Sequence, residues 1–104
     1  MSEAKINFPL ISWDEAGVGV RSKVVARDGK RLRLVEFTEA FVEHEWCLKG
    51  HAGYVLGGEL EILFADRIER FAAGDGIMIA GGQEDRHKAK ALGSSVRLIL
   101  VEEE

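Results

Sequence analysis

The chain has 104 residues, of which 46% are hydrophobic and 31% charged, and it holds one proline. This composition excludes disordered, collagen-like and low-complexity chains, and the length suits one compact domain over residues 1–104 with one core. The 18 acidic and 14 basic residues give a formal net charge of -4 at pH 7, which disfavours binding to nucleic acids and to anionic membrane surfaces.

The number of cysteines and the composition of residues 1–10 predict the cellular location of the protein. The one cysteine, Cys47, cannot form an intramolecular disulfide, and residues 1–10 lack the basic patch and apolar run of a signal peptide. No apolar run approaches the roughly 20 residues that span a bilayer. We therefore expect a cytoplasmic protein with no membrane association.

Short segments rich in Val, Ile, Leu and Phe follow one another from Gly19 onward and are separated by turn signals. This pattern is typical of antiparallel sandwiches and barrels. After a candidate edge strand at residues 11–13, the predicted strands cover residues 20–26, 31–38, 54–56, 59–62, 68–71, 77–80, 85–91 and 96–101.

Three details of this pattern carry structural predictions. Asp28-Gly29 lies between the first two long strands and suits the positive φ angles of a tight hairpin turn. Residues 77–80 form a continuous apolar run, which is typical of a strand buried on both faces. Residues 102–104 are three glutamates, which we expect to form a solvated tail.

All three histidines lie between residues 44 and 87. If residues 41–48 are extended, His44 and Trp46 point to one face of the strand. The same alternation turns Cys47 to the other face as a buried, inert thiol, and makes Glu43 a solvated carboxylate.

The other two histidines are placed by their own segments. His51 follows a turn at Lys49-Gly50, and His87 shares its strand face with the carboxylate of Asp85. A sheet that brings these segments together places His44, His51, Asp85 and His87 in one cavity. Imidazoles with a carboxylate suit zinc, iron, nickel, copper or manganese. We therefore predict a divalent metal site, with a set of hydrogen-bonded groups lining a polar cavity as the alternative.

The spacing of these residues resembles the two paired motifs of the cupin superfamily, over about residues 30–101. The first cupin motif runs G-x5-H-x-H, three or four residues, E, six residues, G. This sequence follows that order with His44, Trp46, four residues, His51, six residues and Gly58. The second motif runs G-x5-P-x-G-x2-H-x3-N, and its glycine positions hold Gly74 and Gly82. The resemblance implies an all-β fold, a cupin-type antiparallel β-barrel or jelly roll.

Three positions depart from the cupin pattern. Trp46 stands at the second histidine position, and an indole cannot bind a metal ion. His51 stands where most cupins carry glutamate, and it remains a competent ligand. Asp85 falls at the last ligand position of the second motif, with His87 two residues further on. The implied ligand set is therefore His44, His51 and one of Asp85 and His87.

Three functions are compatible with this resemblance. The first is a small cupin barrel that holds one divalent metal ion, Zn, Ni, Mn or Fe, and acts on or senses a small polar molecule. As an enzyme, such a protein would be of the oxygenase, isomerase or decarboxylase type. The second is a metal-free binding or sensory module, with a pocket lined by Trp46, Tyr54 and the histidines.

The third function is that of a structural subunit whose main role is dimerisation. We expect a homodimer in any case, because a small barrel has open strand edges that need to be covered.

Overall fold

The computed structural model describes residues 4–103. The elements are, in chain order, the 3-10 helix η1 (Phe8–Leu10) and the strands β1 (Asp14–Gly17), β2 (Val20–Arg27), β3 (Lys30–Thr38), β4 (His51–Phe64), β5 (Ile68–Ala72), β6 (Gly76–Ile79) and β7 (His87–Glu103). Within this range, no helix has both the length and the apolar character needed to cross a membrane.

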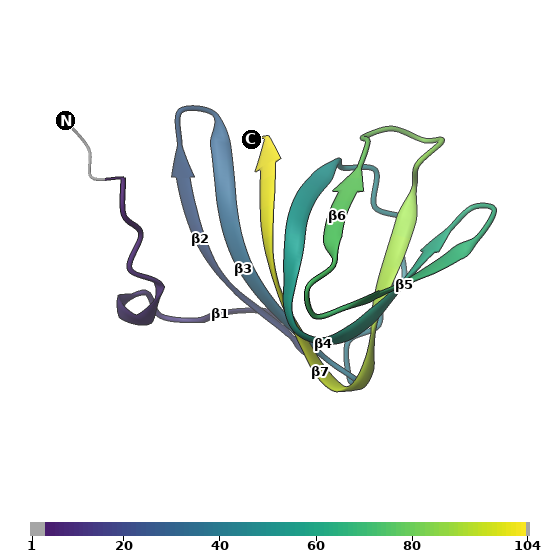
Figure 1. Cartoon of the computed structure of the whole chain (residues 1–104), viewed down its shortest axis with the longest axis horizontal. Helices are drawn as coiled ribbons and strands as arrows, with labels where there is room; N and C mark the ends of the chain where they lie inside the picture. The colour runs from purple at the N-terminus through teal and green to yellow at the C-terminus, as the bar shows by residue number, and fades with distance from the viewer. Residues whose placement is uncertain (1–3, 104) are drawn as a thin grey trace.

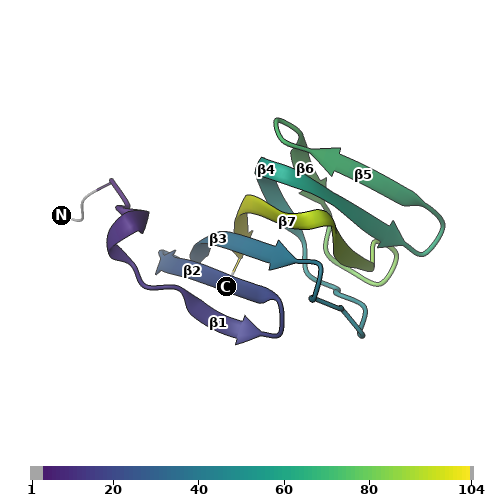
Figure 2. The same cartoon turned by 90° about the horizontal axis from the view of Figure 1, so that it is seen from below.

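The strands form one antiparallel sheet in the order β1-β2-β3-β7-β4-β5, and β6 pairs with the first part of β4. The two longest strands, β4 and β7, pair with each other along most of their length. Both curve strongly, so that the sheet bends back over itself (Figures 1 and 2). The predicted all-β antiparallel architecture is confirmed.

Local turn chemistry explains the first hairpin. Asp28 has a φ of 51° and Gly29 a φ of 78°, which are the positive angles that a two-residue hairpin turn requires. The turn joins β2 and β3 in the register that pairs Arg27 with Lys30. This hairpin was predicted from the sequence and is confirmed, whereas the edge strand starts at Asp14, just beyond the predicted residues 11–13.

A glycine allows β4 to bend without ending. The predicted segments 54–56 and 59–62 belong to this one strand, and its register against β7 shifts on both sides of Gly58. Gly58 has a φ of 76°, and a Cβ added there would lie 2.2 Å from the carbonyl oxygen of Ser95. Such irregularities increase local bending. The bend lets β4 belong to both halves of the curved sheet (Figure 1).

The core lies inside the curved sheet. Its fully or nearly fully buried side chains come from β3, β4, β6 and β7, and they are Val35, Val55, Leu60, Ile62, Phe64, Ile77, Ile79, Ala91, Val96, Leu98 and Leu100. Alternation along each strand explains this set, since inward residues are two apart.

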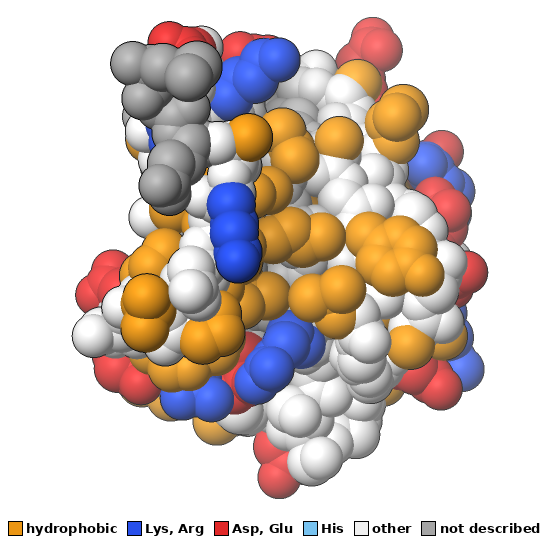
Figure 3. Space-filling view, turned by 60° about the vertical axis from the view of Figure 1, so that its left-hand side comes forward, with side chains coloured by type: hydrophobic (Ala, Val, Ile, Leu, Met, Phe, Trp, Pro, Cys, Tyr) orange, Lys and Arg blue, Asp and Glu red, His pale blue; other side chains and the backbone are white. Residues whose placement is uncertain are grey.

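The strand β6 corrects one prediction. Ile77 and Ile79 are buried, but Met78 between them is 89% exposed. The strand is therefore not buried on both faces, because nothing among the described residues covers its outer side. Figure 3 shows a face of the molecule on which other hydrophobic side chains also gather at the surface.

Candidate functional site

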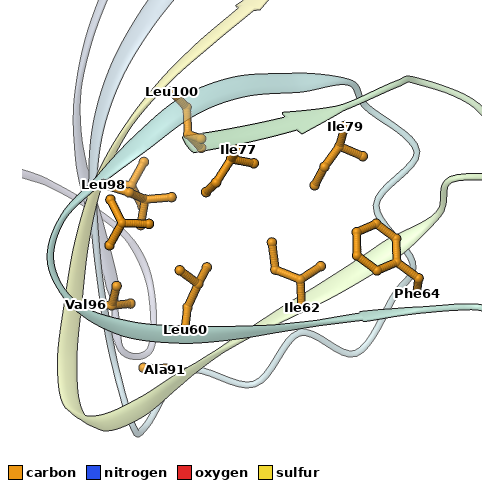
Figure 4. Close-up of a cluster of buried hydrophobic side chains, with 11 residues drawn as sticks. Leu60, Ile62, Phe64, Ile77, Ile79, Ala91, Val96, Leu98 and Leu100 are labelled. Carbon is orange, nitrogen blue, oxygen red and sulfur yellow. The ribbon is translucent and has the colours of Figure 1, made fainter. Parts of the chain in front are cut away.

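A cavity of about 250 Å³ lies between the two halves of the sheet. Figure 4 shows the apolar side chains that surround this space: those of Ile77 and Ile79 on β6 face those of Leu60 and Ile62 on β4. Polar side chains enter the wall from β3, from the start of β4 and β7, and from the segment before β4. They are Arg33, Glu43, Cys47, His51 and His87.

Three of these polar side chains form a cluster, Cys47, His51 and His87, which we call the Cys-His-His cluster. One ligand atom from each residue lies within 4.8 Å of the other two. The Cys47 Sγ is 3.5 Å from His51 Nε2, and the rings of His51 and His87 meet edge-on with their centroids 5.1 Å apart. Cys47 and His87 are also held by their backbones, because each N–H donates to the carbonyl oxygen of the other residue, at 2.8 and 3.1 Å.

His87 presents one free nitrogen to the cluster. Its Nδ1 is 2.9 Å from the carbonyl oxygen of Asp85, which accepts a hydrogen bond, so Nδ1 carries the hydrogen. In the neutral ring the lone pair is then on Nε2. This atom is buried and has no hydrogen-bond partner among residues 4–103. A buried polar atom without a partner is costly, and a bound metal ion would satisfy it.

His51 has a carboxylate next to the corresponding nitrogen. Its Nδ1 lies 2.5 Å from Glu102 Oε2, which leaves Nε2 directed toward Cys47. The Nδ1 of each imidazole therefore lies next to an oxygen atom, and the other nitrogen of each ring belongs to the cluster. Metal-binding histidines have this arrangement, in which the outer hydrogen bond sets the tautomer and the ring orientation.

Glu102 itself is buried, and its side chain is 1% exposed. Nη2 atoms of Arg31 and Arg33 lie 3.0 Å from its two carboxylate oxygens. Burial raises the pKa of Glu102, but the hydrogen bond from His51, the charge of Arg33 and the hydrogen bond from Arg31 outweigh it and lower the pKa from 4.5 to about 2. The prediction of a solvated tail is therefore wrong at Glu102, because β7 continues through this residue beside Arg31 on β3; Glu104 lies outside the described residues.

The donor set suits a transition metal ion. One thiolate and two imidazoles match the three protein ligands of a zinc site that keeps its fourth position open. Tetrahedral zinc with Zn–S of about 2.3 Å and Zn–N of about 2.0–2.1 Å places the sulfur and nitrogen about 3.5 Å apart. The Cys47 Sγ and the His51 Nε2 have this separation.

The structure separates the predicted site residues into two groups. His51 and His87 belong to the Cys-His-His cluster. His44 is exposed and does not line the cavity, and the Asp85 side chain lines a different surface hollow. Asp85 contributes only its backbone carbonyl, to His87.

The two predicted pocket aromatics also lie outside the cavity. Trp46 is 38% exposed, and the cationic groups of Arg86 and Lys88 lie over its ring at 5.3 and 4.9 Å from the centroid. Tyr54 is 48% exposed, because it alternates along β4 with the buried Val55. The expectation that these rings line the pocket is corrected accordingly.

Sequence reasoning missed Cys47 and Glu43 for one reason. Regular alternation would turn both away from the cavity, but residues 41–50 do not form a regular strand and hold only an isolated bridge at Cys47. Both side chains line the cavity, and Glu43 Oε1 accepts a hydrogen bond of 2.7 Å from the N–H of Ala89. The predictions that Cys47 points away from the cavity and that Glu43 is a solvated carboxylate are therefore wrong.

A signal for Cys47 was present in the sequence. The first cupin motif allows three residues as well as four between its second histidine and its next ligand position. Counting three residues back from His51 places Cys47, and not Trp46, at that second position.

Comparison with solved structures identifies the architecture. An RmlC-like cupin from Shewanella frigidimarina superposes with a TM-score of 0.78 at 15% identity, over 98% of this chain and 91% of its own. KdgF from Halomonas sp. gives a TM-score of 0.74 at 22% identity, over 100% of this chain and 96% of its own. This chain has the cupin fold.

The polyketide cyclase RemF from Streptomyces resistomycificus shares this cupin fold, with a TM-score of 0.79 and 16% identity over 98% of this chain and 80% of its own. By sequence, the chain matches no protein-family model, and no curated protein matches it at a significant level. The cupin resemblance read from the two motifs is confirmed at the level of the fold.

Proposed function

We propose that this cupin-fold protein holds one divalent transition metal ion in the Cys-His-His cluster and binds a small molecule beside it in the cavity. The observation that carries the proposal is the orientation of the two imidazoles. The Nδ1 of His51 lies next to the Glu102 carboxylate, and the Nδ1 of His87 donates a hydrogen bond to the carbonyl oxygen of Asp85. The other nitrogen of each ring belongs to the same cluster as the Cys47 thiol.

The chemistry of the ligands favours zinc among the four metals considered. Thiolate is a soft ligand that selects zinc, copper(I) or iron, whereas manganese prefers carboxylate and water oxygens. Cys47 as the third ligand therefore makes Mn the poorest candidate and Zn the best, with Fe and Ni intermediate. Three protein ligands also leave a coordination position for water or a bound molecule.

The surroundings of the cluster suggest how a bound molecule would be handled. A metal ion in this position would supply Lewis acidity to a ligand in its open position. The apolar side chains around the cavity exclude water from that ligand. Glu43 lines the same cavity with one carboxylate oxygen engaged by the Ala89 N–H, and it is the residue available to accept or donate a proton there.

Calorimetric titration of chelator-stripped, reduced protein with zinc tests this proposal. We expect one zinc ion per chain. Cys47→Ser, His51→Ala and His87→Ala should each weaken binding at least tenfold, because each removes one of three ligands. His44→Ala is the matched control, since His44 is exposed and lies outside the cluster, and it should bind zinc as the wild type does.

Two results would contradict the proposal. No heat with zinc, nickel or iron(II) would leave a metal-free binding module as the function of the cavity. Loss of binding in His44→Ala, with Cys47→Ser unaffected, would return the site to the ligand set implied by the cupin motif. A homodimer, formed through the open edges of the sheet, stays a prediction that light scattering tests.

A further inference from the structure

We propose that the cavity selects small organic carboxylates, and that Arg33 is the residue that recognises their charge. This inference rests on the proposed function, because it adds the class of ligand to the same metal-bearing cavity. Its basis is an arginine in the cavity wall, together with the charges of the groups around the cavity.

Arg33 enters the cavity from β3, where it pairs with Leu100 on β7. Its Nη2 is engaged by Glu102 Oε2 at 3.0 Å. Its Nε is buried and finds no acceptor in the described part of the chain. The Nε of Arg31 is in the same state, so this atom does not distinguish Arg33. Arg33 lines the cavity and Arg31 does not, so the guanidinium of Arg33 is the one placed to donate a charge-assisted hydrogen bond to a ligand carboxylate.

The charges around the cavity favour an anion once the metal is bound. The carboxylate of Glu102 is shared by two arginines, Arg31 and Arg33, so this group of three carries a net positive charge. The carboxylate of Glu43 offsets that charge. Without a metal ion, the charges of these groups nearly cancel and the cavity is close to neutral. A divalent ion bound by the Cys47 thiolate adds one net positive charge, so the metal-loaded cavity is positive.

The apolar wall and the volume define the rest of the ligand. The cavity volume of about 250 Å³ lies below the roughly 300–1,000 Å³ of typical drug-sized pockets, so the molecule is small. Phe37 and Phe41 line the cavity, and their rings stack with centroids 4.6 Å apart. Leu98 and Leu100 line it as well. A carboxylate on a compact apolar body, such as a small aromatic acid, fits this combination.

The test compares benzoate with benzamide, which has nearly the same shape and no charge, on zinc-loaded protein whose zinc content is measured in the same samples. We expect the wild type to bind benzoate at least tenfold more tightly than benzamide, the effect of one charge-assisted hydrogen bond. Arg33→Met should lose that preference and keep its zinc. Arg21→Met is the control, because Arg21 pairs with Glu36 at 2.9 Å, does not line the cavity and takes no part in the charge count above, and it should keep the preference.

The outcomes separate this inference from the proposed function. If the wild type binds one zinc ion per chain but shows no preference for benzoate over benzamide, the inference is wrong and the proposed metal site is unaffected. This comparison uses the wild type alone, so it does not depend on whether Arg33→Met folds. A preference that persists in folded Arg33→Met also overturns it, because the metal alone would then select the anion. Failure of the wild type to bind zinc overturns both.

Discussion

Replacing Glu102 by glutamine should destabilise the protein by about 3 kcal/mol at pH 7. Glutamine keeps the shape of the side chain and removes the charge that Arg31, Arg33 and His51 surround. The pKa of Glu102 falls from 4.5 to about 2 on folding, a difference of about 2.5. At about 1.4 kcal/mol per pKa unit, ionisation of Glu102 stabilises the folded chain by about 3 kcal/mol.

The same argument fixes the pH dependence. A carboxyl whose pKa is lower in the folded state contributes fully above its unfolded pKa and loses that contribution as pH falls toward its folded pKa. The stabilisation by Glu102 is therefore complete above about pH 6, and it decreases as pH falls from 4.5 to about 2. At pH 3 we expect the deficit of Glu102→Gln to shrink to about 1 kcal/mol.

Urea unfolding followed by tryptophan fluorescence measures this deficit, with a chelator present so that metal binding at His51 does not contribute. Glu69→Gln is the control, because Glu69 forms an exposed pair with Arg67 and should change the free energy of unfolding by less than about 1 kcal/mol. A deficit below 0.5 kcal/mol for Glu102→Gln at pH 7, or an equal deficit at pH 7 and pH 3, would refute the reasoning.

Three further predictions concern the bend in β4 and the proposed metal site. Gly58→Ala should lower the free energy of unfolding, measured in urea, by more than about 2 kcal/mol, because the added Cβ would lie 2.2 Å from the carbonyl oxygen of Ser95. Gly93→Ala is the control, because Gly93 has a similar φ but open space around it, and it should cost only about 1 kcal/mol. Equal costs would contradict the steric argument. Asp85→Ala should leave zinc affinity unchanged in calorimetry, because only the carbonyl of Asp85 supports His87, and a tenfold loss would make its carboxylate a ligand. Zinc affinity should fall as pH is lowered from about 7 to 5, since both imidazoles must be neutral to bind, and a titration that is flat over this range would argue against histidine ligands.

The fold followed from patterns that are local in the sequence. The φ angles at Asp28 and Gly29 are those expected from the dipeptide, and alternation in β4 separates the buried Leu60 and Ile62 from their less buried neighbours. The predicted ends of strands were less accurate where the chain bends. Gly58 reads as a turn in sequence, but the pairing of β4 with β7 continues through it.

The site was predicted in part, and its errors have a physical cause. His51 and His87 lie on β4 and β7, where regular pairing fixes the direction of each side chain. Cys47 lies in a segment with one isolated bridge, so alternation from His44 gave the wrong face. Glu102 was missed because three consecutive glutamates suggest a solvated end, and only the folded sheet brings two arginines and a histidine to one of them.

Cobalt(II) binding followed by absorption spectroscopy tests the central claim most directly, because a cysteine thiolate on cobalt gives a charge-transfer band that imidazole ligands do not. We expect chelator-stripped wild-type protein to show this band with one cobalt ion per chain. Cys47→Ser should lose the band, and His44→Ala should retain it. A wild-type protein without the band, or a Cys47→Ser protein with the wild-type spectrum, would show that the Cys-His-His cluster does not hold the metal.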